Sequence, residues 1–347
     1  MDMRVPLKFI EAVPVLDRLQ RPLRELRMSV IDRCNFRCSY CMPADSLQGR
    51  GIFLPLEKLL TDHEIENLIH AFVGLGVRKL RLTGGEPLVR PGFPALVQRL
   101  AAIPGLDDIA LTTNGVMLPR LAGDLAAAGL GRLTVSLDTL DEQVLGRMSG
   151  GKAKLQNILD GIAAASDAGF ERIKINTVVQ RGVNDHTVMD LLDHFRGSSH
   201  QVRLIEYMDV GNSNHWSSSE VVPSAEWIEK INRRWPIQPL RPRSSAETAQ
   251  RFEYVDGQGE IGFISSITQP FCGGCSRARV TADGIFYTCL FSNRGTNLMP
   301  LIRHDDSPNG LRDRIVSVWN DRDDRYSEER GQPGKGREKV EMYRMGG

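Results

Sequence analysis

The 347-residue sequence lacks the defining features of several protein classes. Lys plus Arg number 44 and Asp plus Glu 43, so the net charge is only +1, and a bulk nucleic-acid binder would need a larger positive excess. No apolar run reaches the ~18 residues that a membrane-spanning helix needs. Asp2, Glu11 and Asp17 interrupt the N-terminal stretch, which is typical of neither a secretory signal nor a transit peptide. We expect a cytoplasmic protein with no membrane or nucleic-acid partner.

Two glycine-rich segments fall short of nucleotide-binding motifs. Gly257–Gly262 matches GxGxxG, but it lies between two β-type runs and therefore predicts a hairpin turn. Gly146–Lys152 is followed by Ala153 where a P-loop has Ser or Thr, and no strand precedes it, so we interpret it as a mobile loop. The seven histidines show no zinc-type spacing.

Short β-type runs alternate with helical patterns from about residue 25 to residue 210. Five consecutive strand–helix steps predict a parallel sheet with right-handed crossovers. Polar groups follow several strands, as in Thr83–Pro87, Thr112–Gly115 and Ser136–Asp138, which is typical of the mouth of a barrel-type site. The predicted strands are Leu26–Ile31, Lys79–Leu82, Asp108–Thr112, Arg132–Leu137, Arg172–Val179 and Val202–Tyr207. Six strands are fewer than the eight of a full barrel, so the barrel is expected to be open on one side.

The C-terminal third has a different pattern. Runs such as RFEYV, EIGFISSI, ARVTA and IFYTCLF predict antiparallel strands after a helix near 224–235. The fold class is therefore α/β: an incomplete (β/α)6-type TIM barrel, with a smaller C-terminal α+β domain closing its open side. We expect an N-terminal extension over 1–20, the barrel over 21–222, the second domain over 223–319 and a tail over 320–347. The charged composition of that tail predicts flexibility.

The six cysteines form two groups of three. Cys34, Cys38 and Cys41 have the spacing CxxxCxxC on one short loop, and such thiolates can converge on one metal centre. A [4Fe–4S] cluster held by three cysteines leaves one iron open to another ligand. A structural zinc would need a fourth ligand, for which His63 is the nearest histidine.

The second group is Cys272, Cys275 and Cys289, with the spacing CxxC-x13-C. A second cluster with an open iron could hold substrate directly, whereas a zinc completed by His304 is the alternative. Arg277 and Arg279 follow at once and would share one face of a strand, as an anionic substrate requires. Further cations stand on the barrel strands: Arg27, Arg81, Lys174 and Arg203.

The cysteine loop after a first strand, followed by Gly84-Gly85-Glu86-Pro87 after the second, resembles the radical S-adenosylmethionine superfamily. The resemblance implies that S-adenosylmethionine chelates the open iron and is cleaved to a 5′-deoxyadenosyl radical. It also implies that Tyr40 lies beside the adenine, that Gly84, Gly85 and Glu86 bind the methionine amino group, and that Ser136 contacts the ribose or methionine end.

The whole pattern resembles, more narrowly, the GTP 3′,8-cyclases of molybdenum cofactor biosynthesis. The segments that carry this resemblance are LRMSVIDRCNFRCSYCMP, RLTGGEPLVR, LTTNG, VSLD, IEYMDVG, CGGCSRARVTADG, CLF, RDDRYSEER and the terminal Gly346-Gly347. The resemblance implies two [4Fe–4S] clusters, one on each cysteine group, and adds Met208 to the S-adenosylmethionine site. The GTP site it implies comprises Arg27, Arg81, Thr112, Lys174, Arg203, Arg277 and Arg279. It assigns catalytic roles to Arg277, Arg279, Gly346 and Gly347.

The implied activity is that of a lyase. GTP becomes (8S)-3′,8-cyclo-7,8-dihydroguanosine 5′-triphosphate in the first step of molybdenum cofactor (molybdopterin) biosynthesis. The implied partners are an electron donor such as flavodoxin or ferredoxin, and cyclic pyranopterin monophosphate synthase, which receives the product. The protein would be a monomer or a homodimer. The alternative is a peptide-modifying radical enzyme with an auxiliary iron–sulfur cluster, which usually carries more C-terminal cysteines.

Overall fold

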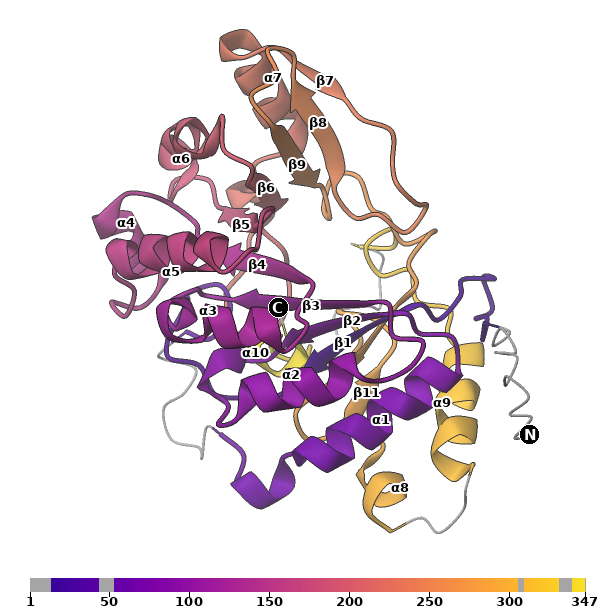
Figure 1. The fold of residues 1–347 in the computed structure, drawn as a ribbon. Helices are drawn as coiled ribbons and strands as arrows, with labels where there is room; N and C mark the ends of the chain where they lie inside the picture. The colour runs from indigo at the N-terminus through magenta and orange to yellow at the C-terminus, as the bar shows by residue number, and fades with distance from the viewer. Residues whose placement is uncertain (1–13, 44–52, 305–308, 331–338, 347) are drawn as a thin grey trace, which may run out of the picture.

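The computed structural model describes residues 14–43, 53–304, 309–330 and 339–346 (Figure 1). Its centre is a single sheet in which six parallel strands alternate with helices along the chain. These strands are β1 (Glu25–Ser29), β2 (Lys79–Thr83), β3 (Asp108–Thr113), β4 (Arg132–Ser136), β5 (Lys174–Val179) and β6 (Gln201–Glu206). Each begins and ends within two residues of the range that the sequence predicts, so the expected partial barrel is confirmed.

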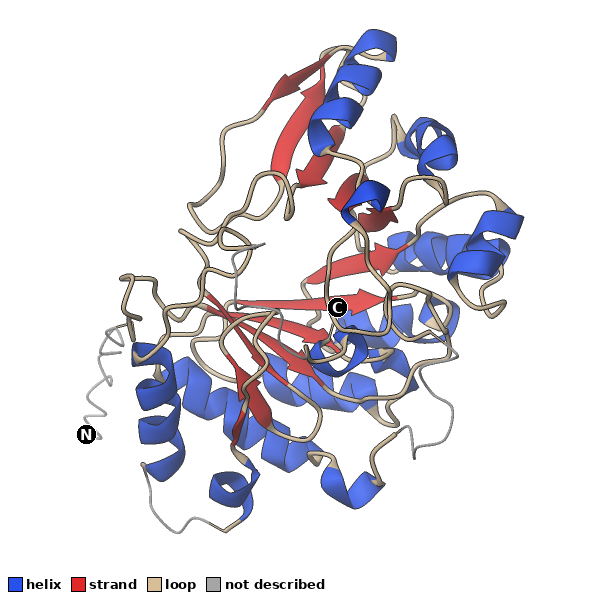
Figure 2. Cartoon of the chain, turned by 180° about the vertical axis from the view of Figure 1, so that it is seen from behind, coloured by secondary structure: helices blue, strands red, loops and turns tan. Residues whose placement is uncertain are grey.

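Helices cover one face of this sheet and leave the other face to the interior of the barrel (Figures 1 and 2). They are α1 (Asp62–Gly74), α2 (Phe93–Ala101), α3 (Leu118–Ala127), α4 (Glu142–Met148), α5 (Leu155–Asp167) and α6 (Val188–Phe195). In α1, Ile65, Leu68, Ile69 and Phe72 recur at helical spacing and are fully buried. A capping box between Thr61 and Glu64 satisfies the first backbone donors of that helix. The helix is therefore fixed at its start and along its apolar stripe.

The C-terminal strands extend the barrel sheet at both of its edges. The remaining elements are α7 (Ser224–Arg234), β7 (Ile237–Pro239), β8 (Gln250–Tyr254), β9 (Glu260–Ile264), β10 (Arg277–Val280), β11 (Ile285–Tyr287), β12 (Thr296–Asn297), α8 (Met299–Arg303), α9 (Gly310–Asn320) and α10 (Met342–Met345). The strand order is β12-β11-β10-β1-β2-β3-β4-β5-β6-β9-β8-β7. The C-terminal region thus adds strands to both sides of the barrel rather than forming a separate sheet.

The predicted antiparallel pairing in this region is only partly correct. β8 pairs with β9, and β10 with β11, in antiparallel fashion. However, β9 runs parallel to β6, and β10 runs parallel to β1. Periodicity along a strand indicates which residues are buried but not which edge the strand will join. The unpaired edges of β1 and β6 provide the partners here, and their direction was already set by the barrel.

The first half of the Gly257–Gly262 segment is a turn, as the sequence predicts, and Glu260–Gly262 begin β9. It joins β8 to β9, which are paired antiparallel. Gly257 and Gly259 have φ angles of +77° and +101°, which L-residues with side chains rarely adopt. Their spacing therefore serves the hairpin and not a dinucleotide.

The prediction of a flexible tail is wrong for the described residues between 320 and 346. Arg322 and Met345 are buried, and at the end of α9 the indole of Trp319 is fully enclosed and donates a hydrogen bond to the carbonyl of Arg21. The charges that suggested solvation are paired, because Lys339 binds Asp209 at 2.7 Å and Arg322 binds Asp17 at 3.0 Å. Composition alone cannot distinguish a solvated charge from a charge with a buried partner.

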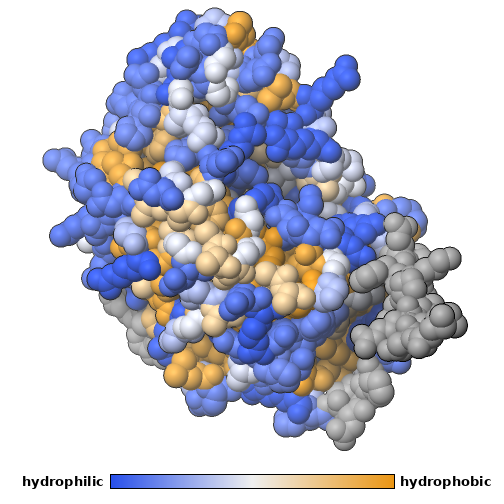
Figure 3. Space-filling view, in the orientation of Figure 1, coloured by the Kyte–Doolittle hydropathy of each residue, from blue (hydrophilic) through white to orange (hydrophobic). Residues whose placement is uncertain are grey.

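Hydrophilic residues cover most of the face shown in Figure 3, with apolar residues in patches between them. Within the described ranges, no helix has both the length and the apolar character needed to cross a bilayer.

The shared core of barrel and C-terminal strands gives a stability prediction. Phe72 of α1 and Phe286 of β11 meet edge to face, with ring centroids 5.5 Å apart. We expect Phe72→Ala to lower the free energy of unfolding by roughly 3–5 kcal/mol, because it removes a buried ring and leaves a cavity. Leu56→Ala, at a side chain that is 67% exposed, is the control and should change little. Denaturant unfolding of the iron-free protein measures both, and equal stability of the two variants would contradict the shared core.

Candidate active site

The first cysteine loop leaves the end of β1 and is held by a glycine-rich loop of the barrel. Backbone amides of Arg37 and Ser39 donate to the carbonyls of Ser149 and Met148, at 3.0 and 2.9 Å. Gly150 has a φ of +66°, and a Cβ there would lie 2.8 Å from the Arg37 carbonyl oxygen. The segment that resembles a P-loop therefore supports the cysteine loop by close backbone contact.

The Gly84–Pro87 segment is fixed to the start of the same loop. Gly85 N donates to Ile31 O, and Glu86 N donates to Arg33 O, both at 2.8 Å. A Cβ on Gly84 would lie 2.4 Å from Ile31 O, and one on Gly85 would lie 2.2 Å from Arg33 O. Neither position can carry a side chain without moving backbone, so these two glycines define how the ends of β1 and β2 meet.

The Glu86 carboxylate is directed into the protein. It accepts hydrogen bonds from Leu88 N, Thr113 Oγ1 and Asn114 N, at 3.0, 2.7 and 2.7 Å. Burial raises the pKa of Glu86 to about 7, although these three donors oppose the shift. Its side chain thus ties β2 to the end of β3. A direct contact of this carboxylate with the methionine amino group stays a prediction.

The thiols of the first group lie close enough to repel one another as thiolates. Burial raises the pKa of Cys34 to about 11, and it raises that of Cys41 to about 12 with a further contribution from Cys34. The pKa of Cys38 is raised well above its usual value by burial and by Cys41, Asp138 and Cys34. Three thiolates so close together need positive charge between them, which the irons of a cluster supply.

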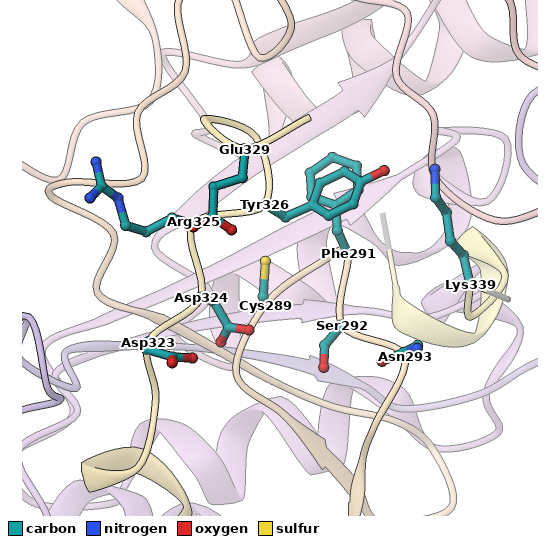
Figure 4. A pocket seen from close by; sticks show the side chains of 10 residues that line it. All are labelled: Cys289, Phe291, Ser292, Asn293, Asp323, Asp324, Arg325, Tyr326, Glu329 and Lys339. Atoms are coloured by element: carbon teal, nitrogen blue, oxygen red, sulfur yellow. The ribbon is translucent and has the colours of Figure 1, made fainter. Parts of the chain in front are cut away.

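The second cysteine group lies beside arginines. Cys275 N donates to Cys272 O at 3.1 Å, which closes the CxxC turn. Burial acts to raise the pKa of Cys275, but Arg277 and Arg322 outweigh it and bring the pKa to about 7. Cys289 lines a cavity of about 270 Å³, and Figure 4 shows its sulfur pointing into this space beside the stacked rings of Phe291 and Tyr326.

A structural zinc is the alternative for both cysteine groups. Thiolates on one tetrahedral zinc lie roughly 4 Å from one another, given Zn–S bonds of about 2.3 Å. Among the residues with described positions, no three His, Cys, Asp or Glu side chains are arranged to hold a single ion. His63 and His304, the proposed fourth ligands, are both exposed. Three cysteine sulfurs in each group are the ligand set that a [4Fe–4S] cluster with one open iron takes, and those of the first group lie close enough to repel one another as thiolates.

Three further residues expected at the S-adenosylmethionine site, Tyr40, Ser136 and Met208, lie at the same end of the barrel. Tyr40 OH donates to Asp138 Oδ2 at 2.8 Å, and Asp138 Oδ1 accepts from Val178 N at 2.9 Å. Burial raises the pKa of Asp138 to about 6, against the effect of both donors. Ser136 ends β4, two residues before Asp138. Met208 follows β6, and its carbonyl accepts a hydrogen bond from Asn214.

Arginines line neighbouring strands inside the barrel. Register aligns Arg27 of β1 with Arg81 of β2 on one side and with Arg279 of β10 on the other. Arg81 donates to Thr112 Oγ1 and Thr134 Oγ1, at 3.2 and 3.3 Å. Because all three strands are parallel, the guanidiniums form a row across the sheet.

Two more cations approach from β5 and β6. Arg203 donates to Asn176 Oδ1 at 2.9 and 2.6 Å. Burial lowers the pKa of Arg203 to about 9, and repulsion from Arg81 and Arg27 adds to the effect. Burial, followed by repulsion from Arg203, lowers the pKa of Lys174 to about 7. The interior therefore carries an excess of positive charge that favours an anionic ligand.

Glu25 is a carboxylate within this row that the sequence analysis missed. It lies opposite Arg277 in the register, and its Oε1 is 3.5 Å from Arg27 Nε. Burial acts to raise its pKa, but Arg27, Arg81 and Arg277 lower it overall, so Glu25 remains ionised. The signal in the sequence was its position two residues before Arg27, which places both side chains on one face of the strand. Thr134 and Asn176 were also missed, although their places at inward positions of β4 and β5 follow from alternation.

Arg277 and Arg279 lie on β10 at alternate positions, as expected. Arg277 Nη1 donates to Ala246 O at 3.2 Å, and its guanidinium stacks over Phe271 at 5.2 Å. Arg279 is buried and donates to the carbonyl of Met345 at 3.0 Å and to that of Gly346. Met345 and Gly346 therefore reach the arginine row.

The last described residue, Gly346, has a φ of +73°, and a Cβ there would lie 2.6 Å from Thr83 Cγ2. Two contacts upstream anchor the tail to the loop after β6. Lys339 binds Asp209, and Glu341 accepts hydrogen bonds from Asn212 N and Ser213 Oγ, both at 3.0 Å. Gly347 lies outside the described residues.

Comparisons with known proteins agree with this arrangement. Residues 28–195 match the family model of the radical SAM superfamily, and residues 200–328 match that of the Molybdenum Cofactor Synthesis C family. Among solved structures, Streptococcus suis SuiB bound to S-adenosylmethionine has a TM-score of 0.59 at 15% identity. The match covers 86% of this chain and 68% of that one. This likeness concerns the fold alone.

Curated relatives are similar over nearly their whole length. A GTP 3′,8-cyclase of Xanthomonas campestris pv. campestris (strain B100) is 50% identical over 338 residues, covering 97% of this chain and 99% of that protein. One from Acidothermus cellulolyticus is 51% identical over 91% of this chain and 88% of its own. One from Staphylococcus haemolyticus is 41% identical over 96% of this chain and 99% of its own. Matched end to end at this identity, the chain belongs to the GTP 3′,8-cyclase family of the radical SAM superfamily.

Proposed function

We propose that this enzyme is a radical S-adenosylmethionine lyase that converts GTP to (8S)-3′,8-cyclo-7,8-dihydroguanosine 5′-triphosphate. This is the first step of molybdenum cofactor biosynthesis. The observation that carries the proposal is the position of the arginine row between the two cysteine groups. Cys34, Cys38 and Cys41 follow β1, whereas Cys272 and Cys275 precede β10, which is parallel to β1. The two groups therefore belong to opposite ends of the same strands.

This arrangement suits a substrate held at both ends. The five residues of β1 span roughly 16 Å, and Arg27 lies midway along them. We propose that each cysteine group holds one [4Fe–4S] cluster. Cys34, Cys38 and Cys41 would hold the first cluster, which would supply the electron for cleavage of S-adenosylmethionine. Cys272, Cys275 and Cys289 would hold the second, which would offer a binding position for the guanine base.

The residues of this chain bind the triphosphate and orient the nucleotide. Arg27, Arg81, Arg203 and Arg279, with Lys174 and Thr112, offer charge-assisted hydrogen bonds to a triphosphate inside a site of low dielectric. Tyr40, Gly84, Gly85, Glu86, Ser136 and Met208 shape the S-adenosylmethionine site. Ring closure between C3′ and C8 requires one nucleotide conformer, and fixing both ends of GTP favours that conformer.

The tail and the partners complete the proposal. Gly346 reaches Arg279, so we propose that Gly346 and Gly347, with Arg277 and Arg279, act at the reacting nucleotide. We further propose a cytoplasmic enzyme, monomeric or homodimeric, that takes electrons from flavodoxin or ferredoxin. Its product would pass to cyclic pyranopterin monophosphate synthase.

The assignment of one cluster to each cysteine group predicts that substitutions in the two groups abolish different activities. Anaerobically reconstituted protein should contain about eight irons, four per cluster. We expect Cys38→Ala to abolish S-adenosylmethionine cleavage. Cys275→Ala should leave cleavage uncoupled from cyclisation, since only the second group would bind the base. Iron analysis, 5′-deoxyadenosine release and mass spectrometry of the GTP product measure these effects. Equal cleavage by both variants would refute the division of roles.

The arginine row predicts a specific loss of GTP affinity. Arg81→Ala removes a buried guanidinium whose Nε has no hydrogen-bond partner within the described part of the chain. The loss of a charge-assisted hydrogen bond costs about 1.5–3 kcal/mol, or roughly 10- to 150-fold in affinity. Arg132→Ala is the matched control, because that arginine pairs with Asp108 and is partly exposed. Unchanged GTP binding by Arg81→Ala in anaerobic calorimetry would argue against the proposed binding of the triphosphate by these arginines.

The position of the tail predicts that GTP cyclisation can be lost while S-adenosylmethionine cleavage is kept. Deleting Gly346 and Gly347 should leave both clusters and S-adenosylmethionine cleavage largely intact. Cyclisation should fall by orders of magnitude, because the contact between Gly346 O and Arg279 is lost. Comparing product formation with 5′-deoxyadenosine release tests this, and a truncated enzyme that cyclises GTP at the full-length rate would contradict it.

A further inference from the structure

Two distant segments meet beside the second cysteine group. Asp17 and Arg21, before β1, and Arg322, after α9, have side chains that are at most 2% exposed. Arg21 Nε lies 2.6 Å and Arg322 Nη1 lies 3.0 Å from the same oxygen, Asp17 Oδ2. We call these three residues the buried bracket.

The bracket holds the backbone of the CxxC turn. Arg21 Nη1 donates to Cys272 O at 3.0 Å, and Arg322 Nη1 donates to Cys275 O at 2.8 Å. Arg21 Nη1 also binds Asp324 O at 2.8 Å. Each proposed ligand residue of the turn therefore has its carbonyl fixed by a different buried guanidinium.

The three bracket side chains carry a net charge of +1, from two guanidiniums and one carboxylate. Two guanidiniums share one fully buried carboxylate, and the next carboxylate, Asp324, is 3.5 Å from Arg322 Nε and a quarter exposed. Arg21 Nη2 and Arg322 Nε are buried without a hydrogen-bond partner among the described residues. Burying a cation is costly unless negative charge compensates it. The thiolates of Cys272, Cys275 and Cys289 would provide that charge.

The arginines are held rigidly. The Arg322 guanidinium lies 4.5 Å from the ring of Trp319, whose indole in turn donates to Arg21 O at 3.1 Å. Arg18 N donates to Arg322 O at 3.2 Å. Such preorganised charge acts strongly on a neighbouring group, because little reorganisation is needed.

We propose that Asp17, Arg21 and Arg322 are positioning residues for the second iron–sulfur cluster, fixing the Cys272–Cys275 turn and favouring the reduced state of the cluster. This inference rests on the proposed second cluster. One-electron reduction adds a negative charge, which nearby buried cations stabilise, so the bracket raises the reduction potential. The proposal also assigns one role to two distant parts of the chain, the residues before β1 and the segment after α9.

The test uses the full-length enzyme with both clusters. Reductive titration followed by electron paramagnetic resonance reports each cluster separately. The first signal changes when S-adenosylmethionine is added, and the second changes when GTP is added. Arg322→Gln removes the charge, and Arg322→Lys keeps it. Arg18→Gln is the matched control, because Arg18 joins the same two segments through an exposed pair with Asp321.

We expect Arg322→Gln to lower the reduced-to-oxidised ratio of the second cluster at least tenfold at a fixed potential, a shift of about 59 mV for one electron. Arg322→Lys should recover most of that ratio, and Arg18→Gln should match the unaltered enzyme. The first cluster serves as the internal reference and should not change. Selective loss of four irons from the second site in Arg322→Gln, with recovery in Arg322→Lys, would equally support the bracket.

Two results would overturn the inference. One is an Arg322→Gln enzyme with eight irons and an unshifted second cluster. The other is loss of both clusters together with a matching loss of stability in the iron-free protein, which would make the bracket a folding element only. An unaltered enzyme with only four irons and no GTP-sensitive signal would instead refute the second cluster, and with it the proposed function.

Discussion

Repulsion among buried cations inside the barrel is the constraint on which the rest of the structure depends. Arg27, Arg81 and Arg279 stand on adjacent strands, and Glu25 is the carboxylate that pairs with this row. Such a concentration of charge costs folding free energy, and burial already lowers the pKa of Arg81 to about 10. An anionic substrate offsets that cost on binding. The site is thus arranged so that part of the binding energy comes from relief of repulsion.

The order and direction of the strands in the sheet bring these charges together. β10 enters the sheet beside β1 and in the same direction, which puts Arg279 level with Arg27 and Arg277 level with Glu25. An antiparallel β10 would reverse the order of its residues and move the second cysteine group to the other end of the strand. The parallel pairing therefore determines two features together, namely the arginine row and the separation of the two cysteine groups.

Much of this could be predicted from the sequence, because local patterns determined it. Alternation and turn residues gave the six barrel strands, and spacing gave the cysteine groups. The pairing of β9 with β6 and of β10 with β1 could not be predicted, since it depends on which sheet edges remain open. Nor could the burial of Arg322 or Trp319 be predicted within a charged segment. Their partners, Asp17 and Arg21, lie about 300 residues away in the sequence.

The same long-range contacts determine which of the two cysteine sites can be completed first during folding. The first group lies on one loop that is held from within the barrel, by the ends of β1 to β4 and the Gly150 loop. The second needs β10 and β11 and, through the buried bracket, residues from both ends of the chain. Closing such distant contacts costs loop entropy that is recovered only when the final packing forms. The second site is therefore complete only in the fully folded chain, whereas the first is built from a nearly contiguous part of the barrel.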